Sequence, residues 1–288
     1  MDRRIIELYD RFTHGGMNRR EFLDRLTALA GSTAAAVALL TLLQNDYAKA
    51  AIVAPDDARL VTERVSFESS KGKIGGYLAR PTAKERRPAV LVIHENRGLN
   101  PHLEDIARRL AAEGFFAYAI DLLSLVGGTP ADEDTARTLH GKLNVDDAVA
   151  VLADAVAFLK KHPEATGKVG AVGFCFGGMM VNRLAAASRE LDAGVAYYGR
   201  QVPADQVPNI QAALLLHYAG NDAGVNAGIE AYEAALKANK KRYEIHTYPG
   251  AQHAFNNDTS AARYNKEAAD LAWGRTVAFF KEHLNAAG

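Results

Sequence analysis

Short apolar runs alternate with longer amphipathic segments along the chain from Glu63 to its C-terminal end. The runs have the length of strands, whereas the segments between them repeat apolar residues at the period of a helix. The predicted strands span Glu63–Ser69, Ile74–Ala79, Ala89–His94, Phe115–Ile120, Val169–Gly173, Ala193–Tyr198, Ala213–Tyr218 and Arg242–Tyr248. The predicted helices span His102–Glu113, Asn144–Lys161, Phe176–Ala187, Gly228–Ala238 and Ala261–His283.

Apolar strands joined by helices predict the α/β class, with a mainly parallel sheet covered by helices on both faces. The first two strands are separated by a Lys-Gly turn and predict an antiparallel hairpin at the edge of this sheet. We expect one domain over residues 51–288. In such a sheet, the side chains that carry chemistry gather at the carboxyl ends of the strands.

Residues 26–43 are the most apolar stretch of the chain and fit either an export leader or a buried helix. Before them, residues 18–23 (NRREFL) resemble a twin-arginine export motif, and Ala48-Lys49-Ala50 resembles a leader cleavage site. This order predicts a leader over residues 1–50 and a periplasmic protein. The alternative is a cytoplasmic protein that retains two N-terminal helices, over residues 1–12 and 20–43. A stable membrane anchor is not expected, because the stretch is short and rich in alanine.

Composition narrows the kind of ligand. Thirty-four basic residues balance thirty-four acidic ones, so no net field attracts nucleic acid or an anionic membrane. Cys175 is the only cysteine, which excludes an internal disulfide and a thiolate metal cluster. A small, weakly charged molecule is therefore the expected partner, and both a monomer and a dimer fit the pattern.

The segment Gly173-Phe174-Cys175-Phe176-Gly177-Gly178 lies between a predicted strand and a predicted helix. It matches the nucleophile-elbow pattern G-x-S-x-G, with sulfur in place of oxygen. A turn this sharp strains the backbone of the nucleophile and leaves room only for glycine on either side. It also puts Cys175 at a helix N-terminus, where the dipole and the amide groups favour a thiolate. Cys175 is therefore the candidate nucleophile, and the alternative is an inert apolar cysteine.

A thiol nucleophile needs a base, and the base needs an orienting group. In folds with this elbow, the acid and then the histidine follow the nucleophile along the chain. Asp222 follows one predicted strand, and His253 lies in a glycine-containing turn after the next. Each residue alone would fit a turn aspartate or an ordinary histidine, but their order after Cys175 predicts a catalytic triad. His217 and His246 are expected to be structural.

With these three residues assembled, the chain resembles the dienelactone hydrolase family (carboxymethylenebutenolidases) from about residue 60 to about residue 285. The cysteine elbow GFCFGG is the most specific likeness. Three further segments match, namely His94–Asn100 (HENRGLN), Tyr197–Gly199 (YYG) and Gly250–Phe255 (GAQHAF). The resemblance implies an α/β-hydrolase fold and hydrolysis of an ester or lactone through a thioester, with no metal or organic cofactor.

The resemblance also implies that Glu95 is a fourth catalytic residue, which bonds the resting thiol. The alternative is a structural carboxylate that pairs with Arg97 or another loop residue. By their position in the fold, the backbone amides of Phe176 and Asn96 are the expected oxyanion donors.

Two arginines that bind the carboxylate of dienelactone in the family are missing. Residues 121–125 (DLLSL), directly after the strand Phe115–Ile120, contain no arginine, and the position four residues after His253 is Asn257. Arg200 and Arg97 are candidate replacements, and Tyr198 is a further candidate for substrate binding. The sequence thus predicts a cysteine-dependent hydrolase of esters or lactones. An acyltransferase of the same fold, and a non-catalytic or redox-sensing protein built on it, are the alternatives.

Overall fold

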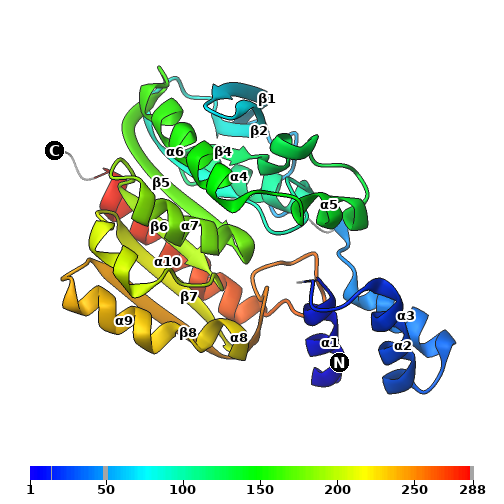
Figure 1. Ribbon diagram of the computed structural model, residues 1–288. Helices are drawn as coiled ribbons and strands as arrows, with labels where there is room; N and C mark the ends of the chain where they lie inside the picture. Colours follow the sequence, from blue (N-terminus) through cyan, green and yellow to red (C-terminus); the bar gives the residue numbers. More distant parts are fainter. Residues whose placement is uncertain (14, 48–50, 286–288) are drawn as a thin grey trace.

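The structure is a computed structural model, and it describes residues 1–13, 15–47 and 51–285. Its centre is one eight-stranded sheet with the order β1-β2-β4-β3-β5-β6-β7-β8 (Figure 1). The pairs β1–β2 and β2–β4 are antiparallel, and all other neighbours are parallel. The predicted parallel sheet and the predicted antiparallel hairpin at its edge are therefore both present.

The strands are β1 (Leu60–Ser69), β2 (Gly72–Pro81), β3 (Arg87–Ile93), β4 (Phe116–Ile120), β5 (Ala165–Phe174), β6 (Ala193–Tyr197), β7 (Ala213–Asn221) and β8 (Tyr243–Gln252). The helices of the α/β body are α4 (Pro101–Ala112), α5 (Glu133–His140), α6 (Val145–Lys161), α7 (Phe176–Ala187), α8 (Ala223–Asn226), α9 (Ile229–Ala238) and α10 (Lys266–Asn285). Two 3₁₀ helices, η2 (Leu122–Val126) and η3 (Ala204–Asn209), complete the body.

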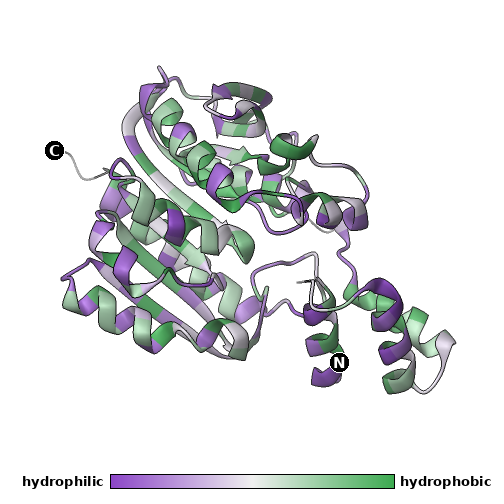
Figure 2. Ribbon diagram, viewed as in Figure 1, coloured by the Kyte–Doolittle hydropathy of each residue, from purple (hydrophilic) through white to green (hydrophobic). Residues whose placement is uncertain are grey.

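Helices cover both faces of the sheet, as predicted. Helices α6, α7 and α9 pack on one face, and α4 and α10 pack on the other. Successive residues of β3 alternate between the two cores, so that Leu91 faces the first and Val92 the second. Each such fully buried side chain contributes about 1.5–3 kcal/mol. Figure 2 shows the apolar colouring of the central strands between the helix layers.

One helix of the body begins at a different residue from the one predicted, and one helix was not predicted. The closing helix begins at Lys266 and not at Ala261, because side chains before it hold the chain in turns: Asn257 accepts from the amide and hydroxyl of Thr259, and Ser260 accepts from Arg263. Helix α5 was not predicted, because its sequence EDTARTLH has little apolar periodicity.

Three N-terminal helices form a separate lobe beside the body (Figure 1): α1 (Arg3–Thr13), α2 (Arg19–Ala30) and α3 (Thr33–Leu43). The single helix predicted over residues 20–43 is thus two helices. Gly31 ends α2 in the left-handed region, with a φ of 81°, and Ser32 caps the amide of Ala35 at the start of α3. We call α1–α3 the N-terminal lobe. The proposed cleavage site at residues 48–50 lies outside the described residues.

Within the described part of the chain, no single helix is long and apolar enough to cross a membrane. Helices α2 and α3 meet the length and composition criteria only when they are counted together, and they are bent by 112° at their junction.

Candidate active site

Cys175 lies at the tight turn between strand β5 and helix α7. Its backbone has a φ of 55° and a ψ of −112°, a sparsely populated conformation that stores strain. A Cβ atom on Gly173 would come within 2.1 Å of the carbonyl oxygen of Gly177, and one on Gly177 within 2.2 Å of that of Ile93. The flanking positions therefore accept only glycine, for the reason the sequence suggested.

His253 and Asp222 lie next to this turn and contact each other. His253 Nδ1 is 2.5 Å from Asp222 Oδ2, and both side chains are largely buried, with 9% and 11% of their surface exposed. Asp222 also caps the short helix α8, where it accepts from the amide of Val225 at 3.3 Å. This second contact fixes the carboxylate toward the imidazole.

Cys175 lies close enough to the ring of His253 to act on the pKa of that ring, through both its charge and its side-chain contact. Burial alone would lower the pKa of His253. A negative charge on Cys175, the hydrogen bond that His253 donates to Asp222, the side-chain contact with Cys175 and the charge of Asp222 outweigh burial and raise that pKa well above its ordinary value. The site therefore favours the protonated imidazolium form of His253.

Tyr198 and Glu95 lie beside this pair. The ring centroid of Tyr198 is 4.9 Å from that of His253, and burial, together with the charges of Glu95 and Cys175, raises the pKa of Tyr198 well above its ordinary value. The phenol therefore stays protonated. Glu95 is 4% exposed, and its Oε2 accepts a hydrogen bond from Asn257 Nδ2 at 3.0 Å. The resemblance implied a bond from Glu95 to the thiol; the contact found here for its carboxylate is the one with Asn257.

A cavity of about 1150 Å³ opens above Cys175. Its floor includes Cys175, Asp222, His253 and Tyr198, and the side chains of Phe176, Asn96 and Arg200 also line it. The structure thus brings most of the predicted residues to one cavity.

The residues that the sequence offered for anion binding differ in their positions. Arg200 is exposed and lines the cavity. Arg97 does not line it: its guanidinium is 4% exposed, donates to Tyr9 OH at 2.9 Å and pairs with Glu133 at 3.0 Å. Asn257 is fully buried and is not among the residues that line the cavity.

The opposite wall of the cavity comes from segments that the sequence did not connect with the site. The N-terminal lobe supplies apolar and cationic side chains, and α5 and the turn after it supply others. These lining residues include Arg3, Arg11, Phe12, Met17, Arg19, Arg137, Leu143 and Val145. The sequence predicted a leader over residues 1–50, and a cleaved leader would take no part in the active site. The apolar face of α1, formed by Ile5, Leu8, Tyr9 and Phe12, was the signal that this helix packs on something.

The other histidines near this region have structural partners. His217 is fully buried between Tyr248 OH at 2.9 Å and Thr276 Oγ1 at 3.1 Å, and burial lowers its pKa well below the ordinary value. His246 lies at the surface and pairs with Glu244. In residues 1–13, 15–47 and 51–285, no group of three or more His, Cys, Asp or Glu side chains is arranged to hold a metal ion.

Comparison with known proteins places this architecture. A model described as the dienelactone hydrolase family matches residues 74–284, which is more than half of the chain. The chain belongs to the dienelactone hydrolase family. A second model, described as YqhI-like, matches residues 1–31, which hold α1, α2 and the turn between them.

Relatives and solved structures agree with this family. A protein of Methylorubrum extorquens named "Putative carboxymethylenebutenolidase" is 31% identical over 276 residues, covering 91% of this chain and 94% of the relative. An Escherichia coli K12 protein of the same name is 30% identical, with 85% and 98% covered. The crystal structure of a "Putative Dienelactone Hydrolase" from Klebsiella pneumoniae is 30% identical, with a TM-score of 0.71 and coverage of 77% of this chain and 99% of the other.

These findings confirm the predicted family and the α/β-hydrolase fold. The dienelactone hydrolase-like chain is therefore a hydrolase of the carboxylic ester class.

Proposed function

We propose that this hydrolase cleaves small esters or lactones through a thioester on Cys175, with His253 as acid and base and Asp222 as its orienting group. One observation carries the proposal: Cys175, His253 and Asp222 line the same cavity, Cys175 acts on the pKa of His253, and His253 Nδ1 is 2.5 Å from Asp222. Nucleophile, base and orienting group in this sequence of contacts are what acyl transfer requires.

In the proposed cycle, the thiolate of Cys175 attacks the carbonyl carbon of the substrate and forms a tetrahedral oxyanion. When this intermediate collapses, the C–O bond breaks, and the imidazolium of His253 gives its proton to the leaving oxygen. The neutral imidazole then takes a proton from water, whose oxygen attacks the carbonyl carbon of the thioester. The C–S bond breaks, the acid leaves, and the thiolate of Cys175 and the imidazolium of His253 are restored. No metal or organic cofactor takes part in these steps.

Two backbone amides would hold the oxyanion. Phe176 is the first residue of α7, so its amide has no acceptor within the helix and points toward the elbow. Asn96 follows β3 and lines the same cavity. Preorganised donors of this kind are worth about 10²–10³ in kcat each.

Glu95 is proposed as a fourth catalytic residue that assists the release of the thiol proton. Its buried carboxylate and Cys175 both act on the pKa of Tyr198, which supports their placement around the same ring. In this proposal Glu95→Gln, which preserves the shape of the side chain, lowers the rate of acylation.

For the substrate, Arg200 is the exposed cation from the α/β body that lines the cavity, whereas Arg97 is engaged elsewhere. We propose that Arg200 attracts an anionic group on the substrate, with Tyr198 as the adjacent wall. The loss of the two family arginines supports a substrate other than dienelactone.

A panel of esters and lactones, assayed with the wild type and with Cys175→Ala, tests the proposed chemistry. With p-nitrophenyl acetate, Cys175→Ala is expected to lose at least about 1000-fold in kcat. A variant that keeps a tenth of the activity would overturn the assignment of Cys175. Substrate analogues should also protect the wild-type thiol from iodoacetamide, and the products formed with added alcohols separate a hydrolase from an acyltransferase.

Export through the twin-arginine route stays a prediction, and we propose its alternative, in which the N-terminal lobe is retained. Arg97 and Arg263 in the body are each 4% exposed, and both have partners in α1. Removing that helix would leave two buried guanidinium groups without these partners, which is costly. Mass spectrometry of the protein purified from its native host tests this, because a cleaved leader would remove about fifty residues.

A further inference from the structure

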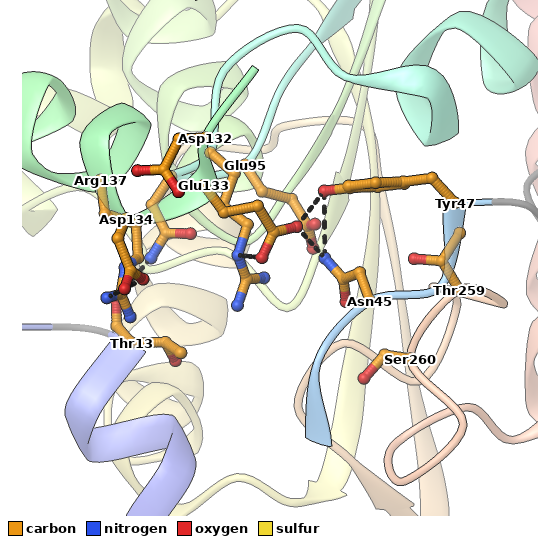
Figure 3. Close-up of polar contacts among 12 residues, drawn as sticks. Thr13, Asn45, Tyr47, Glu95, Asp132, Glu133, Asp134, Arg137, Thr259 and Ser260 are labelled. Atoms are coloured by element: carbon orange, nitrogen blue, oxygen red, sulfur yellow. Dashed lines mark hydrogen bonds and ion pairs between the residues drawn. The ribbon is translucent and has the colours of Figure 1, made fainter. Parts of the chain in front are cut away.

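The loop after strand β3 is tied to helix α1 by two side chains. Asn96 donates from Nδ2 to the carbonyl oxygen of Thr13 at 2.6 Å, and Arg97 donates from Nη2 to the hydroxyl of Tyr9 at 2.9 Å. Asn96 is 8% exposed and Arg97 is 4% exposed, so both contacts are shielded from water. Figure 3 shows Thr13 at the end of α1, together with Glu95, Asp134 and Arg137 of the body. The N-terminal lobe therefore contacts the segment that carries the proposed oxyanion donor.

Helix α1 is itself held in place. The ring of Phe12 stacks on that of Phe22 at 4.4 Å, and the guanidinium of Arg137 lies 4.2 Å above Phe12. Arg263 Nη1 bonds Asp10 at 3.1 Å. These contacts anchor the end of α1 to both α2 and the body, so the Thr13 carbonyl is a fixed acceptor and not a mobile one.

We propose that the hydrogen bond from Asn96 to Thr13 is a positioning contact for the oxyanion hole, so that the N-terminal lobe is a working part of the active site. The inference rests on the proposed function, because it requires the amide of Asn96 to hold the oxyanion. Within one residue, the side chain and the backbone amide share the same Cα, so fixing Nδ2 restricts the rotation of the amide. Catalytic donors must be held within about 0.5 Å of their working position.

The chemistry of the contact favours this role over simple stabilisation. Asn96 lies in a turn after β3 that is closed by one backbone hydrogen bond of 3.4 Å, from the amide of Gly98 to the carbonyl oxygen of Glu95, and the amide of Asn96 belongs to no helix or sheet ladder. The side-chain bond to Thr13 replaces that missing constraint. The acceptor of this hydrogen bond is the backbone carbonyl of Thr13, so the bond depends on the position of helix α1 as a whole.

The first test is Asn96→Ala, which removes the side-chain bond and leaves the backbone amide in the chain. We expect kcat for p-nitrophenyl acetate to fall about tenfold or more, because the donor is displaced. KM should stay within about twofold, and the rate at which iodoacetamide alkylates Cys175 should not change, because neither depends on the oxyanion hole. Asn239→Ala is the matched control, since it removes an amide-to-carbonyl bond of 2.9 Å on the far helix α9.

An unchanged kcat in Asn96→Ala would overturn the inference. So would parallel losses of kcat and alkylation rate, which would indicate general damage to the site. If Asn96→Ala folds poorly, Asn96→Asp gives the same reading, because it preserves the size of the side chain and sets an oxygen against the Thr13 carbonyl. Activity in Cys175→Ala would contradict the proposed function itself, so the two failures are distinguishable.

A double-mutant cycle tests whether the effect passes through α1. Phe12→Ala removes the ring between Phe22 and Arg137 and should lower kcat by letting the Thr13 carbonyl move. If Phe12→Ala affects the active site through Asn96, the kcat of the double variant Phe12→Ala/Asn96→Ala should be only slightly lower than that of Asn96→Ala alone. Losses in kcat that multiply would mean that the two side chains act independently, and would overturn the positioning role.

Discussion

Replacing Asp222 with asparagine removes the charge that faces His253 and keeps the size of the side chain. The two groups are 2.5 Å apart and about nine-tenths buried, so solvent screens their attraction only weakly. At an effective dielectric constant of about 20, two unit charges about 4 Å apart attract by about 4 kcal/mol. If this attraction is lost from the step that forms the imidazolium, kcat falls about 1000-fold.

The same substitution also shifts the pH profile. In the wild type, the pKa of His253 is raised well above its ordinary value, so the imidazolium persists to higher pH. Asp222→Asn lowers that pKa, and the alkaline limb of kcat/KM should move to lower pH. A histidine with a raised folded pKa stabilises the fold below its unfolded pKa and loses this effect as pH rises through the folded value. The variant should therefore lose more stability at pH 6 than at high pH.

The assay is the hydrolysis of p-nitrophenyl acetate between about pH 5 and pH 10, a range that brackets the ordinary pKa of histidine. Asp192→Asn is the control, because it makes the same exchange at a partly buried carboxylate beside β6, where Asp192 accepts from the amide of Val169. A kcat within twofold of the wild type in Asp222→Asn, with an unmoved alkaline limb, would refute the orienting role of Asp222.

Three further outcomes are expected. Arg200→Ala should raise KM for an anionic ester about tenfold and leave KM for a neutral ester unchanged. If the substitution changes KM by the same factor for both esters, Arg200 does not bind an anionic group. Met17→Trp fills part of the cavity wall and should lower kcat/KM for an octanoate ester about tenfold relative to acetate; unchanged chain-length preference would exclude this wall from substrate contact. Asp10→Asn leaves buried Arg263 without a charged partner and should cost about 2 kcal/mol, or about 5 °C in Tm. A Tm equal to that of the wild type would show that the lobe contributes little to stability.

The parts of the site that the sequence predicted are those with a local signature. The glycines around Cys175 mark the elbow, because the turn excludes any Cβ at Gly173 and Gly177. The chain order of the elbow, a loop aspartate and a turn histidine then indicated Asp222 and His253. The strands and their mainly parallel arrangement needed only apolar runs and the helices between them, whereas the order of the strands was not predicted.

The remaining features depend on contacts between residues far apart in the chain, which leave no local pattern. Thr13 meets Asn96 across 83 positions, and Glu95 meets Asn257 across 162. The packing of the lobe on the body could not be predicted either, because an apolar alanine-rich segment fits both an export signal and a packed helix. Arg97 was a reasonable candidate for substrate binding from its position, but its guanidinium is engaged in the body and the lobe.

The covalent step is the centre of the proposed mechanism, and it can be observed directly. The enzyme is mixed with excess p-nitrophenyl acetate, quenched in acid during turnover, digested and analysed by mass spectrometry. We predict one added acetyl group on the peptide that contains Cys175, and none in the Cys175→Ala protein. Turnover without an acetylated Cys175, or an acetyl group on another residue that decays at the rate of turnover, would contradict a thioester mechanism.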